Sequence, residues 1–128
     1  MKSFNVLIVD DSPIMRIVAK QVMTSNGFEF IIEAGNGVEA EAALEKSLTG
    51  RRFGLIISDY NMPQKNGLEF LKSVKASAEF ANIPFIFMST NTDREIISKM
   101  IAAGAKGYIL KHFTAETFEA SIKKVIKF

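Results

Sequence analysis

The sequence predicts a doubly wound α/β sandwich in a single domain spanning residues 1–128. Short apolar runs alternate with amphipathic stretches five times along the chain. Strands that alternate with helices in this way form a parallel sheet covered by helices on both faces. The length of 128 residues suits one domain with one core, and no linker, low-complexity segment or fixed-period repeat interrupts the alternation.

The five predicted strands are almost continuously apolar and rich in Val, Ile and Phe. Such runs are typical of parallel strands that are buried on both faces. In chain order, the predicted strands are Phe4–Val9, Phe28–Ala34, Phe53–Ser58, Pro84–Ser89 and Gly107–Leu110.

The five predicted helices are marked by capping signals. Ser12 supplies an N-cap residue before Pro13 at the first helical position, and Asn26-Gly27 ends that helix. Thr114 marks the start of the last helix. In chain order, the predicted helices are Pro13–Asn26, Gly37–Leu48, Gly67–Lys75, Thr92–Ala103 and Thr114–Lys127.

The composition argues against several classes of protein. There is no cysteine, so disulfides and thiolate metal sites are excluded and a reduced, cytoplasmic compartment is expected. No apolar stretch approaches the roughly 20 residues that span a bilayer, so we expect no membrane insertion. Because 16 basic residues are scattered among 14 acidic ones, we expect a solvated surface and no nucleic-acid binding.

Charged and hydroxyl side chains gather at the carboxyl ends of the predicted strands. Asp10-Asp11 follow the first strand, Asp59 the third, Ser89 ends the fourth and Lys111 follows the fifth. In a parallel sheet these ends share one edge, which is where such folds bind their ligands. Taken singly, each residue could be only a helix cap or a solvated lysine. Their convergence favours a functional site.

The charges at this edge call for a cation. Neighbouring carboxylates repel by about 4 kcal/mol per pair at ~4 Å in an effective dielectric of ~20. Lys111 supplies one positive charge, which leaves a formal deficit of two that a divalent ion would neutralise. With oxygen ligands and no His or Cys, the site favours Mg²⁺ or Mn²⁺ over zinc. A metal, a lysine and a spare carboxylate together suit phosphoryl transfer, with the carboxylate as nucleophile.

Three motifs resemble the receiver domains of two-component response regulators, especially the stand-alone chemotaxis (CheY-like) type. They are Asp10-Asp11 after an apolar run, Ser58–Pro63 followed by Gly67, and Gly107–Lys111. The resemblance covers the whole chain. It implies a flavodoxin-like (βα)5 fold whose five parallel strands have the order 2-1-3-4-5.

The resemblance also implies roles for the residues of the site. Asp59 would be the phosphoacceptor, receiving a phosphoryl group from a histidine kinase. Asp11, Asp59 and the backbone carbonyl of Asn61 would ligate Mg²⁺, with Asp10 contributing through water. Lys111 would hold the phosphoryl oxygens. The chain would thus be a monomeric phosphoprotein and not an enzyme, apart from slow hydrolysis of its own phosphoaspartate.

The same resemblance implies how phosphorylation would reach a partner. Ser89 would swing toward the phosphoryl group, and Tyr108 would follow it inward. The binding face would include Ile97 and Ile101, together with Tyr108 and Lys124, and in chemotaxis proteins the partner is the flagellar motor switch. The apolar arc of the fourth helix is wider than covering a sheet edge needs, so part of it should face solvent or a partner. That arc contains Ile96, Ile97, Met100, Ile101 and Ala103.

Two residues depart from the family pattern. The lysine is usually followed by proline through a cis bond, whereas here His112 follows Lys111. A cis bond before a residue other than proline costs about 2.5–4 kcal/mol, so a trans bond and a different placement of Lys111 are open. Thr90 stands where a smaller residue is common, and it could alter access to Asp59 and the lifetime of the phosphorylated state.

Other functions share this architecture. An FMN carrier would place a hydroxyl- and amide-rich phosphate loop after the first strand, where Asp10-Asp11 would repel the phosphate. Phosphatases with an aspartyl nucleophile usually carry Asp-x-Asp and an added cap domain, for which this chain has no room. A phosphate sink, a phosphorelay intermediate and a receiver that signals without phosphorylation remain open alternatives.

Overall fold

The computed structural model describes residues 3–62, 66–90 and 93–126. Five parallel strands form one sheet of order β2-β1-β3-β4-β5, as predicted. The strands are β1 (Asn5–Val9), β2 (Ile31–Ala34), β3 (Phe53–Asp59), β4 (Phe85–Ser89) and β5 (Gly107–Leu110). The helices are α1 (Pro13–Ser25), α2 (Gly37–Ser47), α3 (Gly67–Ala76), α4 (Arg94–Ala102) and α5 (Ala115–Lys123).

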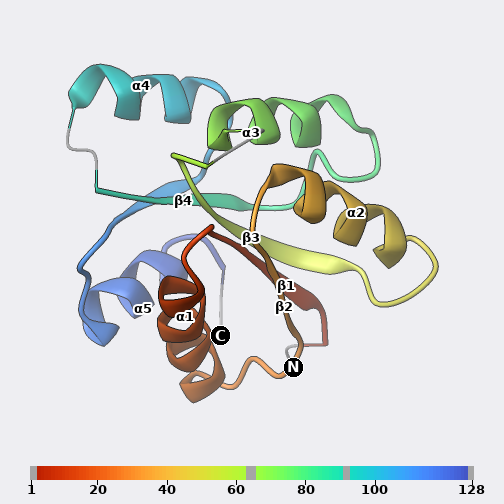
Figure 1. Cartoon of the computed structure of the whole chain (residues 1–128), viewed down its shortest axis with the longest axis horizontal. Helices are drawn as coiled ribbons and strands as arrows, with labels where there is room; N and C mark the ends of the chain where they lie inside the picture. The colour runs from red at the N-terminus through yellow and green to blue at the C-terminus, as the bar shows by residue number, and fades with distance from the viewer. Residues whose placement is uncertain (1–2, 63–65, 91–92, 127–128) are drawn as a thin grey trace.

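The helices cover the two faces of the sheet (Figure 1). Side chains alternate along each strand, so Val6 and Ile8 of β1 pack with α1 and α5, whereas Leu7 and Val9 pack with α2, α3 and α4. All four residues are fully buried. This double core fixes the sheet, and with it the carboxyl ends of the strands.

The two edge strands differ from the prediction. We expected cover on both faces, but Ile32 of β2 is 40% exposed and Leu110 of β5 is 47% exposed. The reason is that each edge strand has only one neighbour in the sheet and lies at the margin of the helical layers. The strand β2 is also shorter than predicted, since it begins at Ile31, and Phe28 is buried in the core although it lies before the strand.

The predicted helices agree with the structure to within one or two residues, except at the end of α5. That helix ends at Lys123, and residues 124–126, which were predicted to continue it, are not helical. Helix α1 has Ser12 as its N-cap with Pro13 in the first turn, and α5 is capped by Thr114. The predicted starting residue Thr92 and final residue Lys127 lie outside the described residues. Within the described part of the chain, no helix is long and apolar enough to cross a bilayer.

Candidate functional site

The side chains predicted to converge do so at the carboxyl edge of the sheet. Asp10 directly follows β1, Asp59 is the last residue of β3, Ser89 is the last residue of β4, and Lys111 directly follows β5. Asp10, Asp59 and Ser89 are almost completely buried, whereas Asp11 is exposed. The site therefore combines buried polar side chains with one carboxylate that is open to solvent.

Three carboxylates form a potential cation site. One oxygen atom from each of Asp10, Asp11 and Asp59 lies within 4.8 Å of the others. The donor set consists of hard oxygen atoms, which suits Mg²⁺ and similar divalent ions. Two of the three carboxylates are shielded from water, so a bound cation would offset their repulsion more effectively than solvent can. The residues present thus fit a hard divalent cation.

Lys111 lies between the two buried carboxylates. Its Nζ atom is 2.9 Å from Oδ2 of Asp10 and 3.1 Å from Oδ2 of Asp59. Burial alone would lower the pKa of Lys111, but hydrogen bonds and charge interactions with Asp10 and Asp59 outweigh it and raise the pKa. Lys111 is therefore positively charged at neutral pH. It reaches this position although no peptide bond among the described residues is cis.

The surroundings of the Asp59 carboxyl shift its pKa in both directions. Burial raises its pKa above the ordinary value, and the neighbouring charge of Asp10 raises it further. Lys111 and the backbone N–H of Asn61 act in the opposite direction, though less strongly. Ionisation of Asp59 is therefore less favourable than that of an ordinary aspartate, and a cation at the site would favour the ionised form.

His112 follows Lys111 with a left-handed backbone, at φ 65°. This conformation costs an L-residue about 1–2 kcal/mol, and it is worst for β-branched side chains. We expect the free energy of unfolding of H112V to be about 2 kcal/mol lower than that of H112G, because glycine has no Cβ to clash there. Urea unfolding followed by circular dichroism measures the difference. Equal stabilities would mean that the loop does not hold this conformation.

The predicted switch residues are linked through the backbone. The Tyr108 hydroxyl donates a long hydrogen bond of 3.5 Å to the main-chain oxygen of Ser89. Tyr108 is half-buried, and burial raises its pKa. This contact joins Tyr108 on β5 to the end of β4.

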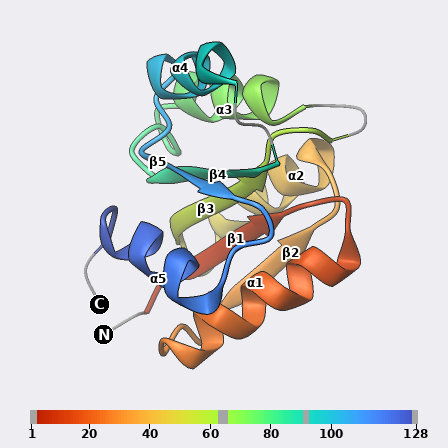
Figure 2. The same cartoon turned by 90° about the vertical axis from the view of Figure 1, so that its left-hand side faces the viewer.

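The predicted partner face lies over α4, β5 and α5, and in Figure 2 the edge strand β5 lies between α4 on one side of the sheet and α5 on the other. Ile101 is 50% exposed. Ile97 is half-buried, and Lys124 is exposed. Met100, from the same apolar arc, is fully buried. The structure thus confirms that only part of the arc is used in the core.

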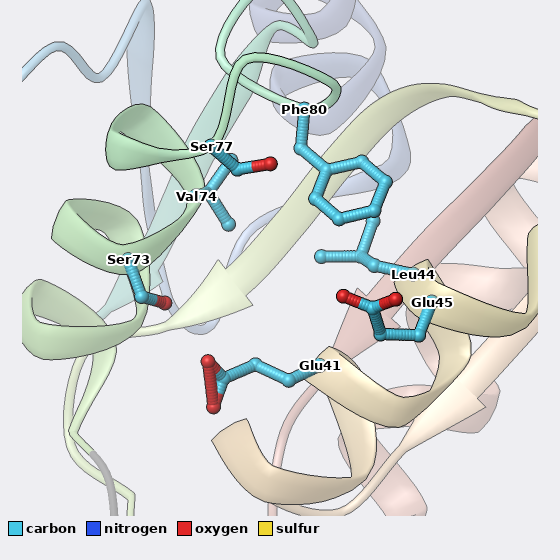
Figure 3. A pocket seen from close by; sticks show the side chains of 7 residues that line it. All are labelled: Glu41, Leu44, Glu45, Ser73, Val74, Ser77 and Phe80. Atoms are coloured by element: carbon cyan, nitrogen blue, oxygen red, sulfur yellow. The ribbon is translucent and has the colours of Figure 1, made fainter. Parts of the chain in front are cut away.

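A separate pocket of about 100 Å³ lies between α2 and α3. In Figure 3, Glu41 of α2 points toward Ser73 of α3. The rest of the lining is Leu44 and Glu45 from α2, Val74 from α3, and Ser77 and Phe80 from the segment after α3. Its lining includes none of the three clustered aspartates. The carboxylate cluster, with its convergent charges, is the better candidate for the functional site.

Arg16 is one contributor that the sequence reasoning missed. Its guanidinium donates a hydrogen bond of 2.6 Å to the main-chain oxygen of Asp10. A signal was present, since Arg16 shares a helical face with Ala19 and Met23, which are buried in the core. A charged side chain on the buried face of a helix needs a partner.

Comparison with known proteins agrees with this geometry. The response regulator receiver domain matches residues 6–123. Chemotaxis protein CheY-3 of Vibrio cholerae is 33% identical, over 98% of this chain and 94% of the relative. Chemotaxis protein CheY1 of Helicobacter pylori is 33% identical, over 94% of each chain.

Solved structures match over nearly the whole chain. The structure of V. cholerae CheY4 has a TM-score of 0.86 and 33% identity, covering 96% of this chain and 98% of its own. The CheX–CheY complex of Borrelia burgdorferi with BeF₃ and Mg²⁺ has a TM-score of 0.85 and 27% identity, covering 94% of this chain and 87% of its own. The chain therefore belongs to the response regulator receiver domain family, and it is a receiver of the CheY-like type.

Proposed function

We propose that this protein is a phosphorylation-activated signalling switch in which Asp59 accepts a phosphoryl group from a histidine kinase. The observation that carries the proposal is the cluster of three carboxylates at the carboxyl edge of the sheet, two of which contact the same lysine. Such a charge arrangement serves phosphoryl transfer, where positive charge must be held beside a nucleophile. A receiver that signals without phosphorylation would not need the complete set.

Each residue has a role in this proposal. Asp11, Asp59 and the backbone carbonyl of Asn61 would hold Mg²⁺, or Mn²⁺ in its place, and Asp10 would contribute through water. The bound ion supplies positive charge to the phosphoryl oxygens. A carboxylate oxygen of Asp59 attacks phosphorus, and the bond from phosphorus to the donor histidine nitrogen breaks. Lys111 stabilises the phosphoryl oxygens with its fixed charge.

The phosphoryl group then changes the partner face. It adds a charge of about −1.5 to −2 at Asp59, which biases a domain between two conformations. Ser89 responds first, and Tyr108 follows it inward and reshapes the surface formed by Ile97, Ile101 and Lys124. Because the relatives are chemotaxis proteins, we propose a cytoplasmic protein that binds the flagellar motor switch. Equal affinity of that partner for both forms of the protein would contradict this output.

The phosphoacceptor role is tested by intact mass. The protein is incubated with Mg²⁺ and acetyl phosphate, and we expect an adduct of about 80 Da. D59N should take up none, and neither should the wild type after chelation of the metal. E79Q, which removes an exposed carboxylate far along the chain from the site, serves as the matched control. An adduct that survives in D59N, or its absence from the wild type, would refute the mechanism.

A further inference from the structure

We propose that Arg16 is a positioning residue that orients Asp11 toward the divalent cation. It acts by holding the peptide group between Asp10 and Asp11. The inference rests on the proposed function in one respect only, the role of Asp11 as a metal ligand. Arg16 itself contacts the main chain of Asp10 and is assigned no contact with the cation or the phosphoryl group.

Arg16 is held in a fixed plane by two partners. Its Nη1 atom donates to the main-chain oxygen of Asp10 at 2.6 Å, and its Nε atom donates to Oε1 of Glu33 at 3.1 Å. The Arg16 side chain is only 19% exposed. A planar guanidinium with two directed hydrogen bonds loses most of its freedom. It can therefore hold the Asp10 carbonyl in one direction.

The carbonyl of Asp10 and the nitrogen of Asp11 belong to one planar peptide group. Fixing the carbonyl direction consequently fixes the plane from which the Asp11 side chain departs. The Asp10 side chain needs no such help, because Oδ1 accepts a hydrogen bond from the Ser12 N–H and Oδ2 is paired with Lys111. Asp11 is exposed, and no described residue donates a hydrogen bond to its carboxylate. Its direction thus depends strongly on Arg16.

The charge of Arg16 would by itself oppose metal binding. Glu33 offsets that charge. Its Oε1 atom lies 3.1 Å from Nε of Arg16, and its Oε2 atom lies 3.7 Å from Nζ of Lys20. Lys20 shares Glu33 with Arg16 but is 48% exposed, and no contact joins it to the described residues of the cation site. Lys20 therefore provides a matched control. If Arg16 acted only through its positive charge, its removal should tighten Mg²⁺ binding. If Arg16 positions Asp11, its removal should weaken Mg²⁺ binding.

The test measures Mg²⁺ binding by isothermal titration calorimetry. In R16M we expect the Mg²⁺ dissociation constant to rise about tenfold, the lower end of the usual effect of losing a group that orients a ligand. K20M should stay within about twofold of the wild type. R16K keeps the charge but not the planar fork, so its affinity should fall severalfold. Phosphorylation by acetyl phosphate should be slow in R16M at low Mg²⁺ and recover at saturating Mg²⁺.

Unchanged or tighter Mg²⁺ binding in R16M would overturn the proposal, as would wild-type affinity in R16K. Circular dichroism of the metal-free proteins shows whether each variant folds. If R16M does not fold, the Mg²⁺ affinity of R16K decides the question. The outcomes separate this inference from the proposed function. A wild type that binds Mg²⁺ but takes up no phosphoryl group refutes the proposed function, while the titrations still decide the role of Arg16.

Discussion

Among the glycines at the site, we expect Gly67 to lose the most stability when it is replaced by alanine. A Cβ atom at residue 67 would overlap the main-chain oxygen of Asp59 and lie 2.8 Å from Cα of Tyr60 and 2.7 Å from the Phe87 ring. Two of these three neighbours are backbone atoms, which cannot rotate away. The Gly67 N–H also donates to the Tyr60 carbonyl at 2.8 Å. The loop after β3 can relieve the clash only by moving Asp59.

We expect the free energy of unfolding of G67A to fall by about 3 kcal/mol, the upper range for overpacking a closed site. Urea unfolding followed by circular dichroism measures it. Gly50 is the matched control, because no atom lies within 4 Å of a Cβ added there. G50A should change stability by less than about 1 kcal/mol. If G67A proved as stable as G50A, the close approach between α3 and the end of β3 would be wrong.

The order of strands and helices could be predicted because it depends on local patterns. Capping at Ser12 and Thr114 and the alternation of apolar runs are properties of neighbouring residues. Strand boundaries were less secure, as Phe28 shows. An apolar residue signals burial, but burial does not require membership of the sheet. Exposure of Ile32 and Leu110 at the edges follows from the strand order, which the pattern of apolar runs alone does not give.

The carboxylate site could be predicted because topology brings strand ends together whatever the details of packing. Asp10, Asp59 and Lys111 therefore met as expected. The sequence could indicate that Arg16 needs a partner, but not which one, and it could not show what Gly67 contacts, because these contacts depend on distances between an α-helix and a neighbouring loop. Such distances are set by packing across the whole domain, not by a motif.

Lys111 is expected to be the side chain on which the metal-free site most depends. Its ammonium lies within 3.1 Å of both Asp10 and Asp59, and its side chain is only 14% exposed. K111M would leave two buried carboxylates without their cation. Removing one partner of a buried ion pair costs about 3–5 kcal/mol, so we expect K111M to lose about 3 kcal/mol at neutral pH. K72M, which removes an exposed lysine of α3, should show almost no change.

The pH dependence of that loss has a definite sign. In K111M, the lysine no longer lowers the pKa of Asp59, whereas burial and the charge of Asp10 still raise it. A carboxyl whose folded pKa is raised stabilises the fold below its unfolded pKa of about 4 and loses that stability as pH rises through the folded pKa. The gap between K111M and the wild type should therefore be small near pH 4 and largest at neutral pH.

D59N provides the opposite change at the same site. It removes one of the mutually repelling charges, so in metal-free buffer it should unfold at a free energy about 1 kcal/mol higher than the wild type. Added Mg²⁺ should stabilise the wild type and K111M more than D59N, because it acts on the charge that D59N lacks. Thermal unfolding with and without Mg²⁺ measures how much the ion stabilises each of the three proteins. If K111M matched the wild type in metal-free buffer at neutral pH, the lysine would not be the counterion of this site.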